Sequence, residues 1–180
     1  MNEPIPPDII IRPALLPDAS LIAQIHVRSW QHGYKGIVPQ EILDNLSIEK
    51  AHAGWVQQLT EKPHAVLVSE AQGQVTGWAA FGPTRDADID QQSTWEVFAI
   101  YFDPHAWGRG HSAALWMEME RIIRQQAPSS VSKFTLWVFD SNLRARRFYE
   151  KMGMQVDPNG YKYWEKDQAR IPEIRYWKAL

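Results

Sequence analysis

The strongest constraint on the fold is a doubly apolar strand that runs into a glycine turn and then into a helix, within residues 95–126. Residues 95–102 (WEVFAIYF) are apolar on both faces, which predicts a central strand in a sheet covered on both sides. The turn 107–110 (WGRG) precedes residues 111–126, whose apolar stripe predicts a helix. Such a turn lets a phosphate approach the free N–H groups of the helix, although a G-x-G alone is better explained as a plain tight turn.

The rest of the chain alternates helical and strand patterns without a repeat or a linker, which predicts one α/β domain. We expect residues 1–8 (MNEPIPPD) to be a flexible lead-in and residues 9–180 to form the single domain. The expected strands are 9–12, 65–70, 75–81, 133–139, 154–156 and 173–178, and the expected helices are 17–31, 39–46, 47–61 and 141–152.

Composition excludes several classes of protein. The 19 basic and 21 acidic residues nearly cancel, which argues against a nucleic-acid partner. The chain has no cysteine, so it can form no disulfide and no zinc thiolate site, and the six histidines lack metal-ligand spacing, so we expect no metal. The longest apolar run, 97–102, is far shorter than the roughly 18 residues of a membrane span. No signal peptide is visible, and we expect a cytoplasmic protein without a membrane partner.

A dinucleotide-binding fingerprint competes for the glycine turn. The pattern Gly108-x-Gly110-x-x-Ala113 fits G-x-G-x-x-G/A, and Asp140 follows the next strand. Five residues, 103–107, separate the strand from the glycines, whereas the fingerprint should begin directly after its strand. The turn also lies too late in the chain to open a large doubly wound sheet. This interpretation is therefore disfavoured, and the Walker motif of P-loop enzymes is absent.

Two ordered motifs resemble those of the GNAT superfamily of N-acetyltransferases. Residues 95–110, with Pro104 and the G-x-G turn, resemble its acyl-CoA-binding motif. Residues 136–154 resemble its second motif, a strand, an Asn and a helix ending in FYEKMGM, and 11–19 resembles a frequent opening of the family. Each motif alone is weak, but the pair at this separation is specific, and the resemblance covers residues 9–178.

This resemblance implies a mixed α/β fold, with a V-splayed central sheet flanked by helices on both faces, and acetyl-CoA as cosubstrate. Trp107, Ser112 and His111 depart from the residues that the family usually has at these positions, which puts the exact phosphate geometry in doubt. The implied cofactor-binding residues are Ile100 and Phe102 through their backbones, then Trp107, Gly108, Arg109, Gly110, His111, Ser112 and Asn142.

Two residues are candidates for acid–base chemistry. Glu96 is a carboxylate in an apolar strand, so it needs either a raised pKa or a partner, and it is our candidate base; the alternative is a Glu that reaches solvent or a structural Arg. The resemblance implies that Tyr149 is the general acid for the leaving thiolate and that a backbone N–H, that of Ile100, faces the thioester oxygen. Without the resemblance, Tyr149 would be a core aromatic and Asn142 a first-turn helix residue.

The acceptor is the least determined part of the prediction. By the resemblance, Trp30 and Tyr34 are candidate substrate residues, and the acidic Asp86, Asp88 and Asp90 would suit a cationic amine, although we favour a simple solvated loop. For the three arginines in 144–147 we favour an exposed helix face.

We predict an N-acetyltransferase that moves an acetyl group from acetyl-CoA to a primary amine by direct attack, because no cysteine is present to carry the acyl group. The acceptor is a small-molecule amine or a peptide N-terminus. A non-catalytic acyl-CoA sensor or interaction module is the alternative. The nine tryptophans permit a homodimer and do not require one.

Overall fold

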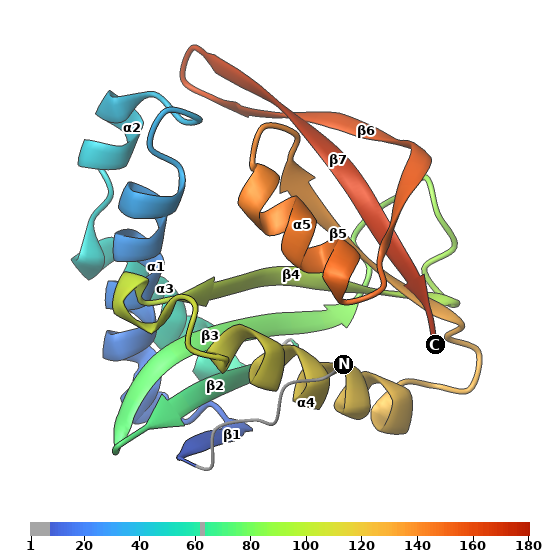
Figure 1. The fold of residues 1–180 in the computed structure, drawn as a ribbon, viewed down its shortest axis with the longest axis horizontal. Coiled ribbons are helices and arrows are strands. Elements are labelled where there is room, and N and C mark those ends of the chain that lie inside the picture. Colours follow the sequence, from blue (N-terminus) through green and yellow to red (C-terminus); the bar gives the residue numbers. More distant parts are fainter. Residues whose placement is uncertain (1–7, 62–63) are drawn as a thin grey trace.

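The computed structural model describes residues 8–61 and 64–180, so most of the expected lead-in, residues 1–7, lies outside the described residues. Seven strands of the described part form one sheet in the order β1-β2-β3-β4-β5-β7-β6 (Figure 1). The strands are β1 (Ile9–Pro13), β2 (Ala65–Ala71), β3 (Gln74–Pro83), β4 (Thr94–Phe102), β5 (Lys133–Phe139), β6 (Gln155–Lys166) and β7 (Ala169–Ala179). The helices are α1 (Ala19–Gly33), α2 (Gln40–Asp44), α3 (Ile48–Glu61), α4 (His111–Gln126) and α5 (Leu143–Lys151), with short 3₁₀ turns at Leu16–Asp18 and Pro104–Ala106.

The sheet opens between β4 and β5. These two strands are parallel, and their register extends only from Thr94↔Lys133 to Val97↔Leu136. On the other side of β4, Ala80 pairs with Ala99 while Phe81 pairs with Val97, so Phe98 is the extra residue of a β-bulge. A bulge bends its strand, and β4 diverges from β5 beyond this point (Figure 1). The expected V-splayed sheet is confirmed.

Helices cover both faces of the sheet, as predicted. Side chains alternate along β2, so Leu67 packs toward α4 and α5 while Val66 and Val68 pack toward α1 and α3. The larger core joins Trp116 and the rest of the α4 stripe to β5 and to Tyr176 of β7. The sheet thereby holds α1 and α5 on either side of the opening between β4 and β5.

Most elements lie where the sequence predicts them. The helix at 111–126 and the strand at 133–139 have the predicted bounds. The C-terminal strands are much longer than the predicted 154–156 and 173–178, because β6 is mostly exposed and carries little apolar pattern. The predicted helix 141–152 starts two residues later, at Leu143, after a capping Asn142.

Two glycines provide a matched test of this packing. A Cβ at Gly77 of β3 would overlap the ring of Phe102, whereas a Cβ at Gly54 of α3 would meet no atom within 4 Å. We expect Gly77→Ala to lower the free energy of unfolding by about 1–3 kcal/mol through overpacking. Gly54→Ala should raise it by about 0.5–1 kcal/mol, because alanine favours the helix. Urea unfolding measures both; equal stabilities for the two variants would contradict the packing of Phe102 on β3.

Candidate active site

A cavity of about 620 Å³ occupies the opening between β4 and β5. One end lies against the glycine turn and α5. The other end is lined by aromatic and charged side chains from α1, β4, β5 and the β6–β7 hairpin. Among the residues predicted from sequence, the lining includes Trp30, Tyr34, Glu96, Ile100, Phe102, Trp107, Gly108, Ser112, Asn142 and Tyr149.

The turn at the first end is open to a ligand. Asp103 caps the 3₁₀ turn before it by accepting a hydrogen bond from His105 N at 3.0 Å. Gly108 and Gly110 have φ of +74° and +86°, a region that disfavours residues with a Cβ. No atom lies within 4 Å of where a Cβ of Gly108 would be, and Gly110 is the N-cap of α4. The first N–H groups of a helix have no acceptor within it, and the space beside Gly108 allows a phosphate to approach those of α4.

Trp107 and Arg144 form one wall of this end. The Trp107 indole Nε1 donates to the Phe102 carbonyl at 3.1 Å, which ties the turn to β4. The Arg144 guanidinium lies 3.6 Å from the centroid of the Trp107 ring and lines the cavity. Arg146 instead binds Asp140 and the Tyr176 hydroxyl. The arginines of α5 therefore differ in their contacts. We expected all three on an exposed helix face, but the side chain of Arg144 reaches the cavity.

The side chain of His111 points away from this cavity. It is buried, and its Nδ1 lies 3.0 Å from Thr76 Oγ1 and 3.2 Å from Ser69 Oγ. Burial lowers the pKa of the His111 imidazole. Arg109, likewise, lines a neighbouring hollow on the other side of the turn. Only the backbones of these two residues are placed to serve the predicted cofactor site.

Asn142, the N-cap of α5, and Tyr149 of α5 both line the cavity. Asn142 caps the helix, since its Oδ1 accepts from Ala145 N at 3.2 Å. Tyr149 is buried, and its ring centroid lies 5.8 Å from that of Trp116 and 6.1 Å from that of Tyr176. Burial raises the pKa of the Tyr149 phenol, so the phenol keeps its proton. Tyr149 is thus a core aromatic that also lines the cavity.

Glu96 has a partner. Its side chain is 3% exposed. Arg85 binds it three times: Nη2 lies 2.7 Å from Oε1, and Nε and the backbone N lie 3.3 Å and 3.0 Å from Oε2. The sequence predicted that Glu96 would have either a raised pKa or a partner. The structure shows a partner, Arg85, which the sequence pattern did not indicate. Both carboxylate oxygens are occupied by these bonds.

Aromatic rings surround the second end. Tyr34 follows α1, and its hydroxyl lies 3.0 Å from that of Tyr101 of β4. The Trp30 Nε1 is buried without a hydrogen-bond partner among the described residues. Phe139 and Trp164 complete the wall, with ring centroids 5.7 Å apart. Sequence reasoning missed these last two, because nothing local marks which side chains of β5 and β6 face the opening.

A second carboxylate, also missed from sequence, belongs to this end. Glu173 of β7 pairs in register with Lys162 of β6, and Lys162 Nζ lies 4.0 Å from Glu173 Oε2. Burial raises the pKa of the Glu173 carboxyl, Lys162 opposes this effect, and the nearby Asp86 and Glu96 add to it. Lys162 Nζ also lies 4.0 Å from the centroid of the Trp137 ring. Both charged side chains line the cavity.

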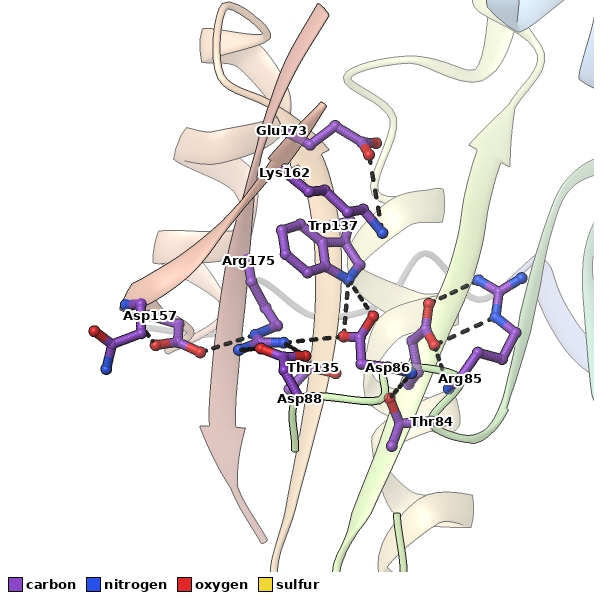
Figure 2. A network of polar contacts seen from close by, with 12 residues as sticks. Thr84, Arg85, Asp86, Asp88, Thr135, Trp137, Asp157, Lys162, Glu173 and Arg175 are labelled. Atoms are coloured by element: carbon purple, nitrogen blue, oxygen red, sulfur yellow. Dashed lines mark hydrogen bonds and ion pairs between the residues drawn. The ribbon is translucent and has the colours of Figure 1, made fainter. Parts of the chain in front are cut away.

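The acidic loop before β4 is held by a buried arginine (Figure 2). Arg175 of β7 is 2% exposed and binds Asp86 at 3.2 Å, Asp88 at 2.8 Å and Asp157 at 2.8 Å. Asp86 also accepts from Trp137 Nε1 at 2.9 Å. The expectation of a simple solvated loop was therefore wrong for Asp86, whose side chain is 11% exposed, whereas Asp88 pairs with Arg175 but is 60% exposed. The network joins the loop that carries Arg85 to the β5–β7 side of the opening.

Two further findings bear on the class of protein. Among residues 8–61 and 64–180, no group of three or more His, Asp or Glu side chains could hold a metal ion. Within the same residues, no helix is long and apolar enough to cross a membrane.

Comparison with known proteins agrees with the geometry. Residues 22–154 match the Acetyltransferase (GNAT) family. The chain is 24% identical to a probable N-acetyltransferase of Mycobacterium tuberculosis over 173 residues. This match covers 95% of this chain and 94% of the relative. It is 28% identical over 134 residues to an uncharacterized N-acetyltransferase of Bacillus subtilis, covering 74% and 73% of the two chains.

Solved structures show the same fold. The ribosomal-protein-alanine N-acetyltransferase of Brucella melitensis superposes with a TM-score of 0.74 at 21% identity, over 95% of this chain and 99% of that one. A putative acetyltransferase of Salmonella typhimurium, solved with acetyl-CoA, gives 0.71 at 21% identity over 96% and 94%. The chain belongs to the GNAT family, which confirms the resemblance seen in its motifs, and it is an acetyl-CoA-dependent acetyltransferase.

The arginine network predicts a specific loss of stability. Arg175→Met would leave three carboxylates gathered without their cation, and we expect the free energy of unfolding to fall by about 3–5 kcal/mol. Arg170→Met is the matched control on the same strand, because its pair with Glu165 is exposed on both sides. Exposed pairs contribute about 0–1 kcal/mol. Chemical denaturation compares the two, and similar losses would contradict a structural role for the network.

Proposed function

We propose that this enzyme transfers the acetyl group of acetyl-CoA to a primary amine bound at the aromatic end of the cavity. The observation that carries this proposal is the continuity of the cavity. It joins the open glycine turn and the unpaired part of β4 to an end that holds a carboxylate and aromatic rings.

The residues present fit the cosubstrate, which supplies the thioester when bound. The N–H groups of residues 108–112 would hold its pyrophosphate at the start of α4. Residues 98–102 of β4 have no strand partner on the β5 side in the described part of the chain. Their backbone is thus free to pair with an extended pantetheine arm through Ile100 and Phe102, in the manner of an added strand. Asn142 would contact the same arm beside the cap that it forms.

Three groups would act in the transfer: an oxyanion donor, a general base and a general acid. The Ile100 N–H would donate to the thioester oxygen, which gains negative charge as the amine attacks the carbonyl carbon. Glu173 would accept the proton that the amine loses as the C–N bond forms. Tyr149 would give its proton to the sulfur as the C–S bond breaks, and its protonated phenol suits that task.

The choice of base moves from Glu96 to Glu173. The oxygens of Glu96 already accept three hydrogen bonds from Arg85, so protonating this buried carboxylate would disrupt its ion pair with Arg85. Among the residues that the structure describes, the Glu173 carboxylate pairs only with Lys162, at 4.0 Å, and its raised pKa strengthens it as a base. Glu96 then serves to hold Arg85 at the cavity.

Two alternatives are less well supported. A non-catalytic acyl-CoA sensor would have no use for a carboxylate and a phenol in one cavity. A peptide N-terminus would need an open, shallow cleft, whereas the aromatic walls of Trp30, Tyr34, Phe139 and Trp164 favour a small amine.

Tyr149→Phe tests the acid. We expect kcat to fall about 100-fold, within the range for general acid catalysis, while the Kd for acetyl-CoA stays unchanged. Release of the free thiol measures turnover, and calorimetry measures binding. Tyr163→Phe, at an exposed position of β6, is the control and should keep full activity. Unchanged turnover of the Tyr149 variant at saturating substrates would remove Tyr149 from the mechanism.

Glu173→Gln tests the role of Glu173 as the general base, through the dependence of kcat/KM on pH. The raised pKa means that wild-type kcat/KM should increase with pH through a value above that of an ordinary glutamate, because only the carboxylate accepts the proton. Glu173→Gln should lose this increase and about 100-fold in rate. Glu96→Gln should keep an increase of kcat/KM with pH, displaced to lower pH because one of the charges that raise the pKa of Glu173 is removed. The reverse pattern, with folding verified by circular dichroism, would assign the base to Glu96.

A further inference from the structure

The charged groups at the aromatic end of the cavity differ in how far they reach solvent. The side chains of Arg85 and Lys162 are 67% and 44% exposed, whereas those of Glu96 and Glu173 are 3% and 15% exposed. From this asymmetry we propose that the acceptor is a primary amine that also carries a small anionic group, the chemistry of an apolar amino acid, and that Arg85 and Lys162 bind the anion. This inference rests on the proposed function and names its substrate class.

Lys162 is a positioned cation without a hydrogen-bond acceptor. Its nearest carboxylate oxygen, on Glu173, is 4.0 Å away, and its Nζ donates no hydrogen bond within residues 8–61 and 64–180. The Trp137 ring, 4.0 Å from Nζ, holds the ammonium in place by a cation–π contact. Trp137 is itself fixed by Asp86 (Figure 2). An ammonium with free donors beside a cavity is suited to bind a carboxylate.

Arg85 presents a second cation from the other side of the opening. Its Nε and Nη2 bind Glu96, which leaves the Nη1 donors for a ligand. The guanidinium lies 4.2 Å from the centroid of the Phe98 ring, at the β-bulge. Figure 2 shows Arg85 on the side of β4, and Lys162 and Trp137 on the side of the β6–β7 hairpin. An anion between them would be bound by both arms of the sheet.

A cationic acceptor such as a polyamine fits less well. Asp86 and Asp88 pair with Arg175 and are not part of the cavity lining, and Glu96, which is, has both carboxylate oxygens bonded to Arg85. The Glu173 carboxylate is 15% exposed and faces Lys162. Of the charged side chains that line this end of the cavity, the two exposed ones, Arg85 and Lys162, are positive. The rings of Trp30, Phe139 and Trp164 suit an apolar body on the same molecule.

The test compares amines that differ only in a carboxylate. L-phenylalanine and 4-(aminomethyl)benzoate are assayed with acetyl-CoA beside 2-phenylethylamine and benzylamine. We expect kcat/KM to favour the carboxylate member of at least one pair by about 10- to 100-fold, as a charge-assisted hydrogen bond would give. Lys162→Met should lower kcat/KM more for the carboxylate member of that pair than for its carboxylate-free partner, so that the preference is lost; because Lys162 also faces Glu173, only the comparison within a pair reports on the anion. Lys162→Arg should restore the preference. Lys166→Met, an exposed lysine on the same strand, should have no effect.

Other outcomes overturn the inference in distinct ways. A wild-type preference for the carboxylate-free amines, or an equal effect of Lys162→Met on both members of each pair, refutes the anion site and leaves the proposed function intact. If no amine is acetylated, the proposed function fails. The anion site is then tested separately, by measuring the binding of two N-acetylated compounds. N-acetyl-L-phenylalanine should then quench tryptophan fluorescence at lower concentration than N-acetyl-2-phenylethylamine, with the difference lost in Lys162→Met; equal affinities refute it.

Discussion

The short parallel register between β4 and β5 is the constraint on which the rest of the molecule depends. Only residues 94–97 of β4 pair with β5, and the bulge at Phe98 turns the remainder away. Backbone groups of a central strand are normally satisfied by both neighbours, so an unpaired stretch inside a sheet is costly unless a ligand pairs with it. The opening therefore places a free strand edge, the glycine turn and α5 around one cavity.

Ion pairs hold the two arms of the sheet around that opening. Arg175 joins β7 to the loop before β4 through Asp86 and Asp88, and Arg85 of the same loop binds Glu96. Buried charges of this kind stabilise little by themselves, but losing one partner is expensive, so they restrict the geometry. The residues that build the acceptor end are thereby fixed by side chains far apart in sequence.

The fold was largely predictable from local patterns. The two-sided apolar strands at 95–102 and 133–139 and the helix at 111–126 have strong periodicity because both faces of the strands and one face of the helix are buried. The long β6–β7 hairpin was underestimated, because β6 is an edge strand with mostly exposed side chains. Its contribution to the site, through Lys162, Trp164 and Glu173, was missed for the same reason.

The sequence by itself determined the class of enzyme, because the glycine turn and the Asn142–Tyr149 helix are local motifs that occur together in the order and at the separation typical of the GNAT family. Only the tertiary structure decided which carboxylates face the cavity. Glu96 and the acidic loop are both conspicuous in sequence, yet arginines distant along the chain engage them. Glu173 shows no local signal and lines the cavity because the register of β6 and β7 places it there. Charge pairing across a splayed sheet depends on contacts between remote segments, which no local pattern encodes.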